Sequence, residues 1–195
     1  MDDKSGYAKL PKIIQAAPND IKHHLAALYW LARISGGIDI IELGVRSGDS
    51  TRALLAAAQD MGGHVWSYDI DGDAYRVKEV TEKHGIEWVD GLWTCTKSDS
   101  IEAANGWGRG TADIVFVDTT HELVQTQREI YAWQHTIRPR GMMVFHDSGL
   151  NEPNRDGVGP AVEAFANNYP NQWSLERHDH CAEGDMGLAW LVRRA

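Results

Sequence analysis

Acidic side chains follow four short apolar runs of this chain, at positions where they could act together. The runs end at Glu42, at Asp69, at Asp118 and at the pair His146-Asp147. An unpaired carboxylate at the end of a buried strand is costly, so packing alone explains the pattern poorly. With His121 three residues after Asp118, these ends offer oxygen ligands for a cation and imidazoles that could accept a proton. We therefore interpret them as one ligand-binding or catalytic site.

The run that ends at Leu43 leads into a glycine-containing turn. Gly44 and Gly48 would let the backbone turn sharply and approach a ligand closely. A helix that begins at Ser50 would point its free N–H groups at the same place. The spacing Glu-x-Gly-x-x-x-Gly lacks the middle glycine of the dinucleotide fingerprint, because Val45 and Arg46 stand there. Across all strand ends, the candidate cofactor-binding residues are Glu42, Gly44, Ser47, Gly48, Ser50, Thr51, Asp69, Ile70, Gly91, Leu92 and Asp118.

Strand and helix patterns alternate along the chain and would position these residues. Alternation predicts right-handed crossovers and a mostly parallel sheet with helices on both faces, and ligands bind beyond the carboxyl ends of its strands. The last two strands are joined by a short connection, which suits an antiparallel pair. The expected fold is an α/β, Rossmann-like, doubly wound sheet of seven strands with one antiparallel strand near the edge. Strands are expected at 38–43, 64–70, 86–89, 112–117, 142–145, 173–178 and 187–192, and helices at 21–35, 50–61, 74–84, 100–104, 123–137 and 158–168.

The composition bounds the partners and the compartment. The chain has 195 residues, which fits a single domain over 1–195 with residues 1–18 as an N-terminal extension. Its net charge of −9 makes duplex nucleic acid a poor partner, since phosphates repel it. Neither a signal peptide nor an apolar stretch of the ~18 residues that span a membrane is evident. We expect a cytoplasmic protein without a membrane partner, and a homo-oligomer stays open.

Two motifs resemble those of class I S-adenosylmethionine-dependent methyltransferases. Residues 41–51 (Ile-Glu-Leu-Gly-Val-Arg-Ser-Gly-Asp-Ser-Thr) resemble the first motif, and residues 65–71 resemble the second, in which Asp69 would bind the ribose hydroxyls. The resemblance is closest to a bacterial subgroup of metal-dependent sugar and macrolide O-methyltransferases and cephalosporin-hydroxylase-like proteins. In that subgroup one strand ends in Val-Asp-x-x-His, as 117–121 does here, and a later strand ends in an acid pair or His-Asp.

The resemblance implies a chemistry for the acidic ends. S-adenosylmethionine would be the cofactor, and a hydroxylated small molecule would be the substrate. Asp118 and Asp147 would hold Mg²⁺ or another divalent cation, and His121 would be the base, with Asp118 beside it in the catalytic set. His146 stands where the subgroup has an acid, and an imidazole ligand shifts the preference toward Mn²⁺, Fe²⁺ or Zn²⁺.

Other interpretations stay open at this point. The chain could transfer methyl groups without a metal, to nitrogen or to a phenol, with His121 as the sole base. It could be an NAD-type oxidoreductase, although the missing glycine argues against this, or a non-catalytic nucleotide-binding module. Asp118 could also simply cap a helix, and His146 could be a hydrogen-bonded histidine without a metal. The loop 148–159 is a candidate lid over the site.

Overall fold

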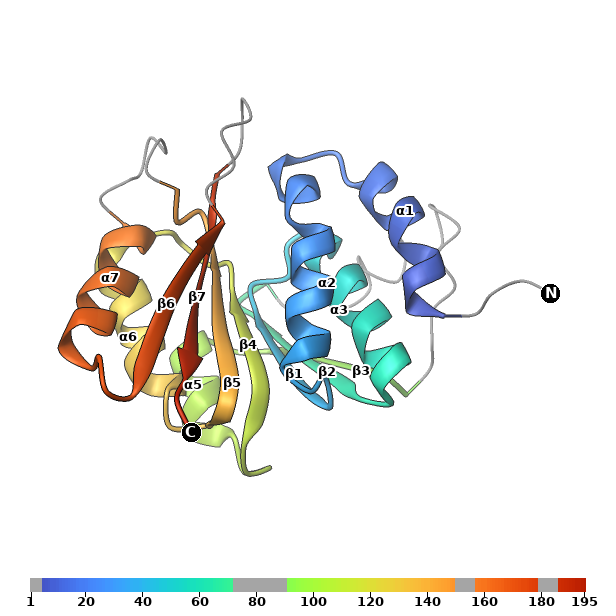
Figure 1. Cartoon of the computed structure of the whole chain (residues 1–195). Helices are drawn as coiled ribbons and strands as arrows, with labels where there is room; N and C mark the ends of the chain where they lie inside the picture. The colour runs from blue at the N-terminus through green and yellow to red at the C-terminus, as the bar shows by residue number, and fades with distance from the viewer. Residues whose placement is uncertain (1–4, 72–90, 150–156, 179–185) are drawn as a thin grey trace.

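A computed structural model describes residues 5–71, 91–149, 157–178 and 186–195. Their strands form one seven-stranded sheet in the order β3-β2-β1-β4-β5-β7-β6. The first five strands pair in parallel, whereas β7 runs antiparallel to both β5 and β6. The predicted fold class, a mostly parallel doubly wound sheet with an antiparallel strand near one edge, is confirmed (Figure 1). The strands are β1 Asp39–Leu43, β2 His64–Asp69, β3 Trp93–Lys97, β4 Ala112–Val117, β5 Ile137–His146, β6 Trp173–His178 and β7 Leu188–Arg193.

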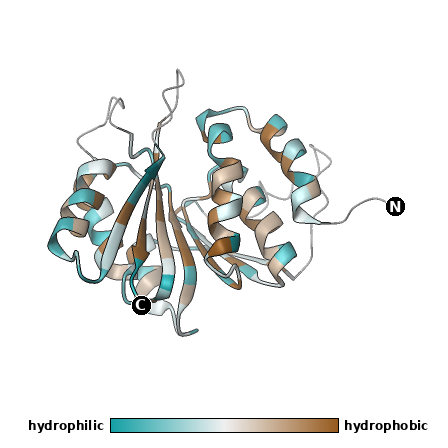
Figure 2. Cartoon of the chain, viewed as in Figure 1, coloured by the Kyte–Doolittle hydropathy of each residue, from teal (hydrophilic) through white to brown (hydrophobic). Residues whose placement is uncertain are grey.

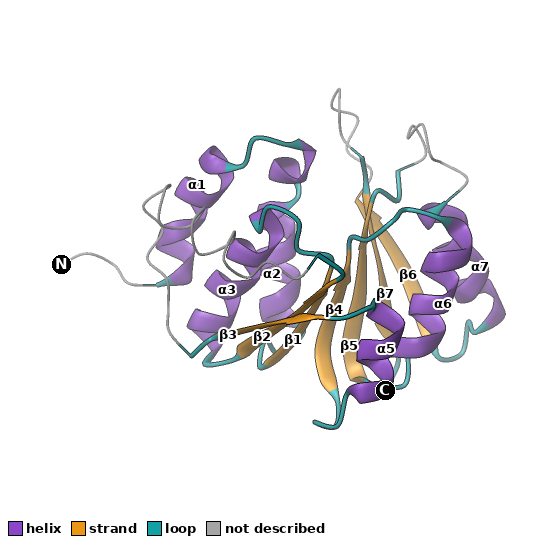
Figure 3. Cartoon of the chain, turned by 180° about the vertical axis from the view of Figure 1, so that it is seen from behind, coloured by secondary structure: helices purple, strands orange, loops and turns teal. Residues whose placement is uncertain are grey.

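Helices cover both faces of this sheet, as Figures 1 and 3 show from opposite sides. Successive strand residues point to opposite faces, so Ile40, Ile114 and Val144 join one hydrophobic core, whereas Ile41 and Val115 join the other. The hydrophobic colouring of Figure 2 follows the strands and the helix sides that meet them. No helix in the described part of the chain is long and apolar enough to cross a membrane. One face carries α1 Gly6–Ala16, η1 Asp20–His23, α2 Leu25–Ile34 and α3 Asp49–Met61, and the other carries α5 Ser100–Gly106, α6 Leu123–Trp133 and α7 Val158–Asn168.

The N-terminal segment packs tightly on α3. The carboxylate of Asp60 accepts hydrogen bonds from the backbone N–H groups of Gly6 (2.6 Å) and Tyr7 (3.2 Å) and from the Tyr29 hydroxyl. Gly6 must lack a side chain, because a Cβ there would run into the carbonyl oxygen of Ala56. The segment then continues into η1, whose first residue lies near the carboxyl ends of the strands. The predicted extension 1–18 is therefore, over its described residues, packed against the core.

Two predicted elements differ from the structure. The helix expected over 123–137 ends at Trp133, and Ile137 instead begins β5, opposite Ala112. The register shifts just beyond this pair, and Pro139, which has no N–H to give a neighbouring strand, is exposed there. Apolar Ile137 continued the helical spacing by coincidence.

The third strand is β3, Trp93–Lys97, whereas the strand expected at 86–89 and the helix expected at 74–84 lie outside the described residues. Gly91 and Leu92, expected to follow a strand and face the cofactor, lie before β3 and line neither of the cavities described below. Both precede β3, and the Leu92 carbonyl accepts from Val65 N–H near the start of β2. They lie at the edge of the sheet opposite Asp69, because β2 and β3 are parallel.

Candidate active site

The turn between β1 and α3 is held by the end of the neighbouring strand. Gly44 (φ +88°) adopts a left-handed conformation, and a Cβ there would run into the carbonyl oxygen of Asp118. The Asp69 carboxylate at the end of β2 accepts from the N–H groups of Val45 (2.7 Å) and Arg46 (3.1 Å). Gly48, also left-handed at φ +77°, then precedes α3. The predicted turn is therefore built by two strand ends and the first turn of a helix.

Glu42 lies behind this turn and is fully buried. Its carboxylate accepts hydrogen bonds from the hydroxyls of Ser50 (2.7 Å), Thr51 (2.8 Å) and Ser67 (2.5 Å). Burial raises the pKa of Glu42 to about 7, although these three hydroxyls lower it. Glu42 lines neither of the two cavities described below. Its hydrogen bonds fix the start of α3 to the ends of β1 and β2.

A Glu42→Gln variant is expected to remove a pH dependence from the stability of the protein. In the wild type the native state binds the proton more tightly than the unfolded chain, whose carboxyl has a pKa near 4.5. Stability is therefore lost as the pH rises from about 4.5 to about 7, by roughly 3 kcal/mol at about 1.4 kcal/mol per pKa unit. Urea unfolding at pH 5 and pH 8 measures this difference between wild type and variant. The same change in unfolding free energy between pH 5 and pH 8 in wild type and Glu42→Gln would contradict this prediction. The control is Glu176→Gln, at an exposed position.

A cavity of about 440 Å³ opens in front of the turn. Its size suits a small-molecule ligand, since such pockets commonly measure roughly 300–1,000 Å³. Of the predicted cofactor-binding residues, Gly44, Asp69, Ile70 and Asp118 line it. Its wall also contains residues that were not predicted from the sequence, namely Tyr68, Ser98, Asp99, Ser100, Thr119, Thr120, Glu122, Gln125 and Glu129.

Glu129 is a lining residue that the sequence reading missed. Its carboxylate is fully buried and accepts from the hydroxyls of Ser100 (2.6 Å) and Thr119 (3.0 Å). Burial raises its pKa, while these hydrogen bonds lower it. The signal was present, because Glu129 stands in α6 directly before Ile130 and four residues before Trp133, both fully buried. An acid on a buried helix face indicates a polar site beneath the helix.

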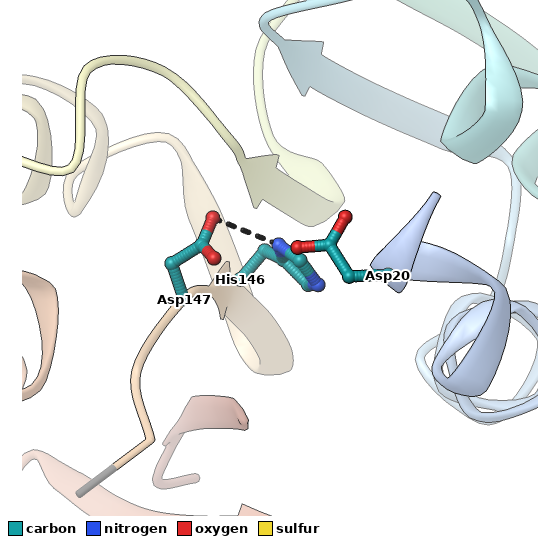
Figure 4. Close-up of side chains that lie close together, drawn as sticks. All are labelled: Asp20, His146 and Asp147. Carbon is teal, nitrogen blue, oxygen red and sulfur yellow. Dashed lines mark hydrogen bonds and ion pairs between the residues drawn. The ribbon is translucent and has the colours of Figure 1, made fainter. Parts of the chain in front are cut away.

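The histidines and aspartates at the ends of β4 and β5 form a second group beside this cavity. His121 Nε2 lies 2.8 Å from Asp147 Oδ2 and 3.3 Å from Asp118 Oδ1. His146 Nδ1 lies 2.9 Å from the same Asp147 oxygen, a contact drawn in Figure 4, and 3.6 Å from Asp118 Oδ1. The four side chains, predicted from two separate strand ends, thus meet in one cluster.

Charge pairing dominates this cluster. Hydrogen bonds to Asp118 and then Asp147 raise the pKa of His121 to about 10. Burial lowers the pKa of His146, but the same two aspartates outweigh it and raise the value to about 10. Burial would raise the pKa of each aspartate, yet the two histidines hold both below their ordinary range. Without a cation, this pairing therefore favours the imidazolium form of both histidines and the carboxylate form of both aspartates.

Backbone strain concentrates at the same place. In the described part of the chain, four non-glycine residues have positive φ, and three of them surround this cluster: Arg46 (+48°), His121 (+58°) and Asp147 (+54°). Such conformations cost on the order of 1–3 kcal/mol each and tend to occur at functional sites. With these backbone conformations, the side chains of His121 and Asp147 contact each other across the strand ends.

A small cavity of about 50 Å³ lies at the cluster and adjoins the larger one. Val45, Arg46 and Asp118 line both cavities. Predicted residues Ser47, Ser50, His121, His146 and Asp147 line the small one. A group bound in the larger cavity can therefore reach the histidine–aspartate cluster past the β1–α3 turn.

The donor atoms of this cluster fit a divalent cation. Asp118, His121 and Asp147 each offer an atom within 4.8 Å of the others. Carboxylate oxygens and imidazole nitrogens together suit Mn²⁺, Fe²⁺ or Zn²⁺, and carboxylates with water suit Mg²⁺. A second such group joins His146 and Asp147 to Asp20, which the sequence reading did not include.

The fold, the β1–α3 turn and the acidic strand ends are together typical of α/β enzymes that bind a cofactor containing a nucleoside. The family described as a methyltransferase domain matches residues 41–148, which span β1 to the end of β5 and contain both cavities' central residues. This match covers more than half of the chain. The chain therefore belongs to this methyltransferase family, and the predicted enzyme class, an S-adenosylmethionine-dependent methyltransferase, is confirmed. The assignment argues against the NAD-type oxidoreductase.

Solved structures share the fold over nearly the whole chain. An O-methyltransferase from Bacillus cereus, solved with S-adenosylhomocysteine, has a TM-score of 0.71 at 17% identity, over 100% of this chain and 93% of that one. The O-methyltransferase TomG from Streptomyces achromogenes, solved with S-adenosylmethionine, has a TM-score of 0.66 at 17% identity, over 100% and 92%. The methyltransferase PaMTH1 from Podospora anserina reaches 0.68 at 12% identity, over 99% and 89%. No curated protein sequence matches this chain.

Proposed function

We propose that this protein transfers a methyl group from S-adenosylmethionine to a hydroxyl of a small molecule, with a divalent cation and His121 as the base. The observation that carries the proposal is the contact between the two cavities at Val45, Arg46 and Asp118. The methyl group of a donor bound in the larger cavity would lie beside the cluster of histidines and aspartates at the ends of β4 and β5. The O-methyltransferase structures that share the fold support the same reaction class.

The larger cavity has the features that an adenosyl ligand requires. S-adenosylmethionine bound there supplies an electrophilic methyl group. Asp69 lies at the end of β2, where a carboxylate can accept from ribose hydroxyls, and the turn 44–48 brings backbone close to the ligand. Tyr68 and Ile70 add apolar surface, and Ser98 to Ser100 add polar groups on the far wall. The predicted residues Ser50 and Thr51 would act behind the turn, through Glu42, whereas Ser47 donates to Asp49 beside the small cavity.

His121 would take the proton of the acceptor hydroxyl. Its Nε2 faces Asp118 and Asp147, which orient the ring and stabilise the imidazolium that forms. A divalent cation held by Asp118, His146 and Asp147 would neutralise carboxylate charge that raises the His121 pKa, and would lower the pKa of a bound hydroxyl. Arg46 and Ser47 border the same space and would position the acceptor.

A second candidate keeps the methyl donor and omits the cation. The observation in its favour is that His121 already has two carboxylate partners among the protein side chains. His121 would then be the sole base, acting on a nitrogen or a phenol with Asp147 as its partner, in the deprotonated form that is the minor one at neutral pH.

Thermal unfolding with ligands tests the proposal. S-adenosylmethionine and S-adenosylhomocysteine at about 100 times their Kd should each stabilise the protein by about 2.7 kcal/mol, whereas NAD should not. Methyl transfer to hydroxylated acceptors should fall in EDTA and return with Mg²⁺ or Mn²⁺. No shift with either adenosyl ligand would refute the proposed donor, and equal turnover in EDTA would favour the second candidate.

A further inference from the structure

A second donor group meets the strand-end cluster from the N-terminal segment. Asp20, the first residue of η1, lies with His146 and Asp147 so that one ligand atom from each falls within 4.8 Å of the others. Figure 4 shows the His146 ring between the two carboxylates, with Asp20 reaching it from the side opposite Asp147. Two ligands of one cation can lie at most about twice a ~2.1 Å bond apart, so this spacing is close to that of a shared ion.

Polar atoms without partners point to what this place binds. His146 is 3% exposed, and its Nε2 has no hydrogen-bond partner among the described residues. Its Nδ1 lies 2.9 Å from Asp147 Oδ2, so a cation shared by His146, Asp147 and Asp20 would take the place of this contact on the Nδ1 side of the ring. A buried polar atom left unpaired is costly, so the unpaired Nε2 indicates that the polar groups around His146 are incomplete without a further bound group.

Asn19 provides a further oxygen. Its Nδ2 donates to Asp49 (3.1 Å), whereas its Oδ1 is buried with no partner in the described chain. Asn19, Asp20, His146 and Asp147 all line the small cavity of about 50 Å³. That volume holds an ion with a few waters, since one water needs roughly 10–15 Å³ by the same measure.

We propose that Asp20 is a ligand of the metal centre, so that Asp20, His146 and Asp147 bind a first-row divalent cation of the Mn²⁺ type in preference to Mg²⁺. This rests on the cation of the proposed function and adds a carboxylate that the β4 and β5 strand ends do not provide. A mixed set of two carboxylates and one imidazole favours Mn²⁺, Fe²⁺ or Zn²⁺ over Mg²⁺. The cation would thereby tie the N-terminal segment to the carboxyl end of β5.

Direct cation binding tests this inference without turnover. Mn²⁺ is titrated into the chelator-treated full-length protein, and free Mn²⁺ is followed by electron paramagnetic resonance, with Mg²⁺ as competitor. Asp20→Asn should weaken Mn²⁺ binding by at least about tenfold, and Asp20→Ser should do the same. Both variants retain an oxygen that can accept from the Ile21 N–H, as Asp20 does at 3.1 Å. Asp39→Asn removes the same charge at the opposite edge of the sheet and should bind Mn²⁺ like wild type.

Two results would overturn the inference: wild-type affinity in Asp20→Asn, or no Mn²⁺ binding by the wild type. S-adenosylhomocysteine binding, measured on the same samples by calorimetry, separates this inference from the proposed function. If Mn²⁺ binding depends on Asp20 but no adenosyl ligand binds, the metal site stands and the proposed donor fails. Unchanged melting temperatures of the variants without metal would exclude unfolding as the cause.

Discussion

Replacement of His121 by asparagine is expected to lower kcat by about 10²–10⁴-fold, the usual contribution of a general base. Asparagine tolerates the left-handed backbone at this position (φ +58°) better than most residues, so the fold should survive. It cannot take a proton at neutral pH, and the hydrogen bonds of the ring to Asp118 and Asp147 are lost or weakened. The measurement is methyl transfer from S-adenosylmethionine to a panel of sugars, phenols and other hydroxylated acceptors.

The affinity for S-adenosylhomocysteine should change little in this variant, because His121 lines the small cavity and not the larger one. His135→Asn, at an exposed position outside both cavities, is the matched control and should keep full activity. Partial rescue of His121→Asn by added imidazole would support a proton-transfer role. Activity of His121→Asn within threefold of wild type would assign the base to another residue.

Replacement of Asp69 by asparagine is expected to weaken S-adenosylhomocysteine binding by about 10²-fold. The carboxylate lines the larger cavity and also accepts from Val45 and Arg46 N–H, so the variant loses a charged ligand acceptor and the support of the turn. Hydrogen bonds to a charged group contribute about 1.5–3 kcal/mol each, which agrees with that factor. Isothermal titration calorimetry measures it directly.

Glu102→Gln, which removes a charge on exposed α5 surface, is the control for Asp69→Asn. Mn²⁺ binding by Asp69→Asn should equal that of the wild type, because Asp69 is not among the residues around the small cavity. Undiminished S-adenosylhomocysteine affinity would mean that the adenosyl ligand does not bind at this strand end.

The sequence predicted the parallel core of the sheet and the residues at its carboxyl edge because both depend on local patterns. Buried strands such as Ala112–Val117 are nearly continuous apolar runs. The acid that follows each run can be identified from the local sequence, without knowledge of tertiary contacts. The β1–α3 turn was predicted for the same reason, since its glycines and hydroxyl residues lie within nine positions. The meeting of Asp118 with Asp147 followed from the parallel order of β4 and β5.

The residues that were missed depend on contacts between distant segments. Asp20 looks like an ordinary helix-capping acid in the sequence, and it joins the cluster only because the N-terminal segment packs on α3. Glu129 faces the cavity because of how α6 is rotated against the sheet. Gly91 was misassigned because Trp93–Lys97 alternates weakly and is only partly buried, so its strand pattern was not recognised.

The place of β7 has a consequence for how the enzyme is made. His146, at the end of β5, pairs with Leu188, so the strand that leads into His146 and Asp147 obtains its second neighbour from a segment more than forty positions later. During synthesis, strands β1 to β5 can pair with one another before β7 has left the ribosome. Until β7 is available, β5 is an edge strand with unpaired N–H and C=O groups. Cation affinity should therefore arise late in folding, after adenosyl-ligand affinity, because the described residues that line the larger cavity all lie between 44 and 129.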